Sequence, residues 1–153
     1  MRTLVNRQRL GFVASVRADG TPRVSAHGTL AAWDRETLVF ADIAARGTVA
    51  DLLENPAVEV AVVDPLLRKG WRFGGTARLL LSGPTFDRLL AFYRRRGVIA
   101  TAHHMVLVRV ERVEPLVSPV YAQGWSEAEV HARWATHWQA QLGGAARRQG
   151  RRR

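Results

Sequence analysis

Residues 38–56, LVFADIAARGTVADLLENP, decide the fold. The apolar start of this stretch predicts a buried strand, and its second half predicts a short helix that Asn55-Pro56 ends. Between the two lies a polar elbow with Arg46, and Thr48 is a suitable N-cap for the helix. Free backbone N–H groups at a helix start and a guanidinium can face the same anion, so the elbow is a candidate anion-binding site.

Two strands joined by a tight hairpin precede this stretch. Asp19-Gly20 predicts the turn between a strand at residues 11–17 and a returning strand at residues 22–33. The returning strand alternates in polarity, which predicts that Val24 and Ala26 face the core. The opposite face then presents hydroxyl and imidazole groups to a ligand, and these groups belong to Ser25, His27 and Thr29.

The rest of the chain adds three strands and two helices. Apolar or alternating runs predict strands at residues 57–63, 71–81 and 104–113. Helical periodicity predicts one helix that Pro84 opens and a last helix that begins with a capping box of Ser126 and Glu129. Regular alternation in several strands argues against a parallel sheet, whose strands would be apolar throughout. The sequence therefore predicts an α+β fold, a six-stranded antiparallel split β-barrel with flanking helices.

Length and composition exclude several classes of protein. A chain of 153 residues, 47% of them hydrophobic and 24% charged, is typical of one globular domain. The absence of cysteine excludes disulfides, thiolate metal sites and cysteine nucleophiles. His103 and His104 are adjacent, so on a strand they point to opposite faces, and we expect no metal site. Because no apolar run could span a membrane and no signal peptide is visible, we expect a cytoplasmic protein.

The net charge of +10 is concentrated at the end of the chain. Five arginines lie in residues 143–153, and removing them leaves 10 − 5 = +5. We therefore predict a folded domain at residues 1–142 and a basic, disordered tail at residues 143–153. Such a tail gives only a salt-sensitive attraction to nucleic acid, so we expect no specific nucleic-acid partner.

Several short motifs occur in a characteristic order. They are PRVSAHG at residues 22–28, RGT at residues 46–48, DLLENP at residues 51–56 and GWRFGGTA at residues 70–77. In this order they resemble the pyridoxamine 5′-phosphate oxidase-like family of FMN-binding split β-barrels. The resemblance extends over residues 10–113, and the last helix is similar to that of small members.

The resemblance implies a homodimer with FMN at the interface between the subunits. In such proteins the second and third strands and the elbow hold the phosphate and ribityl chain of the flavin. It implies a cofactor site here, whose candidate residues are Ser25, His27, Thr29, Asp42, Arg46 and Thr48, with Trp71 and Arg72 near the ring or the partner subunit. No acid, base or nucleophile constellation indicates a catalytic residue.

Two departures from the family pattern bear on function. His27 stands where many relatives have a lysine or arginine, and the C-terminal segment that recognises pyridoxamine phosphate is not apparent. We therefore expect a flavin-dependent oxidoreductase for an unknown small molecule rather than an enzyme of vitamin B6 oxidation. Two alternatives stay open: a deazaflavin-dependent reductase of the same fold, and a flavin carrier without turnover.

Overall fold

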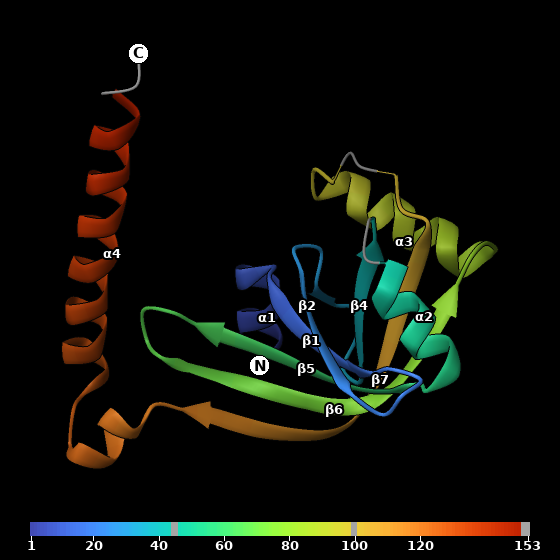
Figure 1. The fold of residues 1–153 in the computed structure, drawn as a ribbon, viewed down its shortest axis with the longest axis horizontal. Helices are drawn as coiled ribbons and strands as arrows, with labels where there is room; N and C mark the ends of the chain where they lie inside the picture. The colour runs from blue at the N-terminus through green and yellow to red at the C-terminus, as the bar shows by residue number, and fades with distance from the viewer. Residues whose placement is uncertain (44–45, 99–100, 151–153) are drawn as a thin grey trace.

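A computed structural model shows a curled antiparallel sheet with four flanking α-helices (Figure 1). It describes residues 1–43, 46–98 and 101–150, and the side chains of residues 46 and 144–150 lie outside that description. The elements in chain order are α1 (Arg2–Gln8), β1 (Gly11–Val16), β2 (Pro22–His27), β3 (Ala31–Ala32), β4 (Thr37–Asp42), α2 (Arg46–Glu54), β5 (Ala57–Asp64), β6 (Lys69–Leu80), α3 (Pro84–Arg95), β7 (His104–Val117), the 3-10 helix η1 (Pro119–Gln123) and α4 (Glu127–Gly150).

The strands form one sheet in the order β2-β1-β5-β6-β7-β4-β3, with antiparallel pairing throughout. The sheet curls so that its two ends approach each other: the ring centroids of His27 on β2 and Phe40 on β4 are 4.2 Å apart. Thr29 strengthens this closure, because its Oγ1 accepts a hydrogen bond from the backbone N–H of Ala41 at 2.9 Å. This arrangement confirms the α+β split-barrel prediction.

The number of strands differs from the prediction of six. The predicted strand at residues 22–33 divides into β2 and the two-residue β3, because the chain turns at Gly28-Thr29 to cross from one end of the sheet to the other. The structure also contains α1, which the sequence analysis did not predict. Val5 on α1 is only 1% exposed and packs on the main core inside the curl of the sheet.

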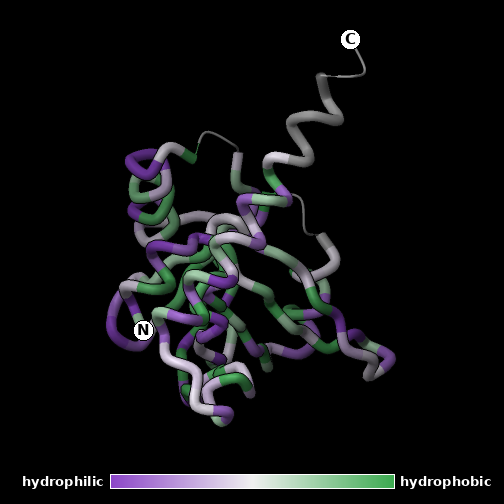
Figure 2. Tube along the Cα trace, turned by 90° about the vertical axis from the view of Figure 1, so that its left-hand side faces the viewer, coloured by the Kyte–Doolittle hydropathy of each residue, from purple (hydrophilic) through white to green (hydrophobic). Residues whose placement is uncertain are grey.

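Strand β4 is buried on both faces. Leu38 and Phe40 contribute to the main core inside the curl, whereas Val39 and Ala41 pack in a second core against α3. Figure 2 shows hydrophobic segments gathered at the centre of the fold and hydrophilic segments in the peripheral turns. This double burial explains why the strand is apolar at nearly every position, and it confirms the buried strand that leads into the elbow.

The prediction of which face of β2 is buried was wrong. Val24 is 66% exposed and Ala26 is also exposed, whereas His27 is 5% exposed and Ser25 is half-buried. The polar face therefore points into the fold. Alternation of polarity defined two faces correctly, but the inward face is stabilised by hydrogen bonds rather than by apolar burial.

Helix α4 begins with the predicted capping box. The backbone N–H of Ser126 donates to Glu129 Oε2 at 2.8 Å, and the Ser126 hydroxyl accepts from the backbone N–H of Glu129 at 3.3 Å. The helix stands to one side, beyond the β5–β6 turn (Figure 1), and continues to Gly150, past the residue 143 boundary of the expected disordered tail. Within the described part of the chain, every helix is too short or too polar to cross a membrane.

Candidate functional site

The elbow between β4 and α2 places the first turn of a helix beside β2. Helix α2 begins at Arg46, two residues before the predicted N-cap, so Thr48 lies within the first turn. Thr48 is 1% exposed, and its Oγ1 lies 2.8 Å from Ser25 Oγ. The N–H groups of a first helical turn have no partner within the helix, so they are available to an anion. The side chain of Arg46, the principal predicted anion ligand, lies outside the described residues.

Ser25 joins the elbow to the polar face of β2. Its Oγ lies 3.0 Å from His27 Nε2 and 2.8 Å from Thr48 Oγ1. A hydroxyl has one donor and two acceptor positions, so Ser25 can satisfy both neighbours at once. The structure therefore brings together three predicted site residues, Ser25, His27 and Thr48.

His27 is buried in an environment that favours the neutral imidazole. Burial lowers the pKa of the imidazole, and the nearby Asp42 carboxylate opposes this shift only in part. The Phe40 ring packs against the imidazole. The imidazole Nε2 lies within hydrogen-bonding distance of Ser25 Oγ, so His27 can orient the Ser25 hydroxyl.

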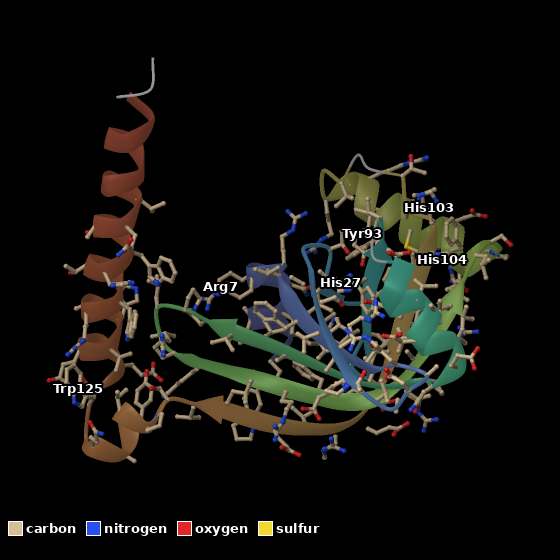
Figure 3. All side chains as sticks on the ribbon, viewed as in Figure 1. Arg7, His27, Tyr93, His103, His104 and Trp125 are labelled. Carbon is tan, nitrogen blue, oxygen red and sulfur yellow. The ribbon has the colours of Figure 1, made fainter. Side chains whose placement is uncertain are left out.

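Asp42 lies at the end of β4, next to the start of β7. Its carboxylate is 2% exposed, and Oδ2 lies 3.2 Å from His104 Nδ1. The backbone carbonyl of Asp42 accepts a hydrogen bond from the N–H of His103 at 2.9 Å. Figure 3 shows His104 at the same end of the sheet as α2 and α3. The sequence analysis considered His104 only as a possible metal ligand and missed this pairing with Asp42.

Arg23 is the positively charged side chain that the sequence analysis missed. Its Nε lies 2.9 Å from the Asp51 carboxylate, and the same Asp51 oxygen accepts a hydrogen bond from Ser15 Oγ at 2.7 Å. The other end of the guanidinium lies against α2: a Cβ added to Gly47 would be 1.5 Å from Arg23 Nη1. Arg23, Ser25 and His27 are spaced two residues apart, so on a strand all three lie on one face. This spacing indicates Arg23 as a site residue together with Ser25 and His27.

Three predicted site residues do not join this cluster. The Thr29 hydroxyl is already hydrogen-bonded to the backbone of Ala41: it accepts from the Ala41 N–H and donates to the Ala41 carbonyl at 3.1 Å. Trp71 is half-buried on β6 and packs against the main core. Arg72, on the opposite face of β6, forms ion pairs with two carboxylates, those of Glu59 and Glu114.

The cluster at the elbow has the chemistry of a phosphate site. It combines the Arg23 guanidinium, the Ser25 and Thr48 hydroxyls and the start of α2, and Gly47 keeps the guanidinium close to the helix backbone. Asp51, one helical turn after Gly47 on α2, contacts Arg23 at Nε, as a neighbouring carboxylate orients a ligand-binding group. Among the described residues no cluster of three metal-ligating side chains is present. The geometry fits a phosphorylated cofactor.

A comparison with protein-family models decides the family. The model described as pyridoxamine 5′-phosphate oxidase matches residues 1–116, which include β1 to β6, α3 and most of β7. This chain belongs to that family. The matched region of this pyridoxamine 5′-phosphate oxidase family member contains the whole cluster at the elbow. No curated protein matches the chain.

Solved structures share the fold of this family member. HupZ of Group A Streptococcus is 29% identical, with a TM-score of 0.69 over 77% of this chain and 92% of HupZ. An F420 reductase is 28% identical, with a TM-score of 0.59 over 74% of this chain and 94% of the reductase. An FMN-binding protein of Syntrophomonas wolfei is 17% identical, with a TM-score of 0.64 over 76% of this chain and 84% of that protein, and shows the fold alone.

Proposed function

We propose that this chain is a flavin-binding oxidoreductase that holds FMN by its phosphate at the elbow. One observation supports this most directly: the Arg23 guanidinium lies against Gly47 in the first turn of α2, next to the paired hydroxyls of Ser25 and Thr48. A phosphate dianion prefers a guanidinium, hydroxyl donors and free N–H groups, and all three meet here.

Each residue of the cluster has a separate task in this proposal. Arg23 supplies the positive charge, and Asp51 orients it through the 2.9 Å contact. Ser25 and Thr48 supply hydroxyl hydrogen bonds, and the buried His27 fixes the direction of the Ser25 hydroxyl. Arg46, at the start of α2, is the second guanidinium that the sequence places at the elbow. Bound FMN supplies hydride or electron transfer, and the protein supplies orientation and electrostatics.

The outer face of the β1–β2 hairpin supports the proposal of a homodimer. Phe12 pairs with Ala26 and Ala14 pairs with Val24, so these side chains share one face. Phe12 is 49% exposed and Val24 is 66% exposed. An exposed apolar surface is typical of an interaction site, and this one lies on the reverse of the strand that bears Ser25 and His27. A second copy on this face would adjoin both flavin sites.

The proposal also includes the type of flavin that this chain binds. The Syntrophomonas protein is an FMN-binding protein, and the reductase is an F420 reductase. We propose FMN first because the elbow cluster is suited to one phosphate group. F420 is the alternative cofactor, and a flavin carrier is the alternative without turnover.

The first experiment is a visible absorption spectrum of the purified protein, followed by titration with FMN, riboflavin and F420. Riboflavin lacks the phosphate, so FMN should bind much more tightly if the elbow holds a phosphate. Preference for F420 would move the assignment to the deazaflavin alternative, and equal affinity for riboflavin and FMN would overturn the phosphate site. Bound FMN that no nicotinamide or dye couple can reduce or reoxidise would indicate a carrier.

Arg23→Gln tests the residue at the centre of the proposal. FMN affinity should fall by about 1.5–3 kcal/mol, the range for a hydrogen bond to a charged group, while riboflavin affinity stays unchanged. Arg78→Gln is the matched control, because Arg78 is an exposed arginine on β6, a strand that contributes no residue to the elbow cluster. A thermal melt of each variant checks that the loss of the Asp51 partner has not unfolded the protein. Unchanged FMN affinity in Arg23→Gln would remove Arg23 from the site.

A further inference from the structure

A cavity lies under α1, at the opposite end of β4 from the elbow. Its volume is about 370 Å³, within the range of about 300–1,000 Å³ that is usual for small-molecule sites. Thr37 and Leu38 at the start of β4 line it, whereas Asp42 at the end of the same strand belongs to the elbow. The cavity is lined by Met1, Arg2, Thr3, Val5, Ala32, Asp34, Arg35, Thr37, Leu38, Phe73, Val110 and Val113.

The floor and walls of this cavity are apolar. Leu38 and Phe73 are each 4% exposed and form the floor as part of the main core, which they share with Val5. Val110 is half-buried and Val113 is 37% exposed, so the apolar surface continues outward along β7. An aliphatic chain placed here would exchange water for contact with these side chains.

The mouth of the cavity carries an excess of positive charge. Arg2 and Arg35 both line it and are exposed, and within the described part of the chain neither has a hydrogen-bond or ion-pair partner. Asp34 is the one carboxylate in the lining, and its Oδ1 accepts the backbone N–H of Glu36 at 2.9 Å. The lining therefore contains two exposed guanidiniums and one carboxylate that already accepts a hydrogen bond.

We propose that this cavity binds an aliphatic monocarboxylate, with the chain on the apolar floor and the carboxylate between Arg2 and Arg35. Apolar walls with a few polar groups at one end are the usual construction of a site for an amphipathic small molecule. A guanidinium is well matched to a carboxylate because it can donate two parallel hydrogen bonds. The proposal is independent of flavin binding, since the cavity shares no lining residue with the elbow cluster.

Titration with octanoate, 1-octanol and octylamine separates the contributions of chain and charge. We expect saturable binding of octanoate at one site, about tenfold weaker binding of octanol and still weaker binding of octylamine. Methyl NMR spectra should show the largest octanoate-induced shifts at Val5, Leu38 and Val110. Absence of saturable octanoate binding, octanol binding as tight as octanoate, or shifts confined to other methyl groups would each overturn the proposal.

Two kinds of variant test the location. The double variant Arg2→Gln with Arg35→Gln should bind octanoate about tenfold more weakly and octanol equally well, whereas Arg78→Gln should leave both affinities unchanged. Val113→Trp, at a partly exposed position, should fill the cavity and abolish binding of both probes. The charge variants change exposed side chains only, so they keep the test decisive even if Val113→Trp fails to fold. If the double variant binds octanoate as tightly as the wild type, Arg2 and Arg35 do not bind the carboxylate and the proposal is overturned.

Discussion

Arg23 occupies the space that a side chain at Gly47 would need: a Cβ at residue 47 would lie 1.5 Å from Arg23 Nη1 and 2.6 Å from Cζ. The two residues come from different elements, β2 and α2, and Asp51, one turn further along α2, holds the guanidinium there through its contact with Nε. This close approach is possible because residue 47 has no side chain, and the first prediction tests it.

Gly47→Ala should displace the Arg23 guanidinium from the first turn of α2. Alanine is a better helix former than glycine, so the helix itself should not be weakened. FMN affinity should nevertheless fall by about 1.5–3 kcal/mol, because the charged hydrogen bond is lost. Flavin fluorescence quenching measures this affinity. Gly28→Ala is the matched control, since a Cβ at residue 28 meets no atom within 4 Å. A fully retained affinity in Gly47→Ala would contradict a phosphate at this position.

Arg46→Ala should also weaken FMN binding by about 1.5–3 kcal/mol, with the oligomeric state unchanged. The reason is the position of residue 46 at the start of α2, where a guanidinium adds to the free N–H groups. Isothermal titration gives the affinity, and light scattering gives the mass of the particle. Unchanged affinity would exclude Arg46 from the site, and a purely monomeric wild-type protein would contradict the proposed homodimer.

His27 should make stability depend on pH below neutrality. Burial lowers the pKa of His27 in the folded state, so the unfolded chain, with an ordinary pKa of about 6.5, binds the proton more readily. The free energy of unfolding should therefore fall as the pH drops below that value, until the folded imidazole also becomes protonated. Urea titrations between pH 5 and 7.5 measure this slope. His27→Gln should flatten it, and an equal slope in the variant would assign the effect to other groups.

Ser126→Ala should loosen the start of α4. The substitution removes one hydroxyl that accepts from Glu129 N–H and donates to Glu129 Oε2, so the helix should lose about 1 kcal/mol. Faster amide hydrogen exchange in the first turns of α4, with unchanged exchange in β4, is the expected readout. Thr136→Ala is a suitable control, because the Thr136 hydroxyl only donates back to Ala132 in mid-helix. Exchange that rises equally across the sheet would instead show that α4 and the sheet unfold together.

Local signals in the sequence predicted the order of strand, elbow and helix correctly. The apolar run ending at Ala41 and the stop at Asn55-Pro56 act within a few residues, so they do not depend on the tertiary fold. The start of α2 was displaced by two residues, because Thr48 uses its hydroxyl for Ser25 rather than for a cap.

The inward face of β2 could not be found from periodicity alone. Alternation identifies two faces, and the apolar one is normally assigned to the core, yet here Val24 is exposed. The polar face is buried because partners far away in the sequence satisfy it: Thr48 lies 23 residues from Ser25, and Asp51 binds Arg23 from α2. Such pairings arise only when the sheet has curled, so the sequence alone did not show that this face of β2 is directed toward α2.

The double burial of β4 sets the order in which the molecule can come apart. Its N–H groups become accessible to solvent only after the core inside the curl and the layer beneath α3 have both separated. Deuterium should therefore enter β4 last, and its exchange rate should report global rather than local opening. The strand that leads into the elbow would then remain in register while α4 and the outer hairpins fluctuate, so the elbow rests on the most persistent part of the fold.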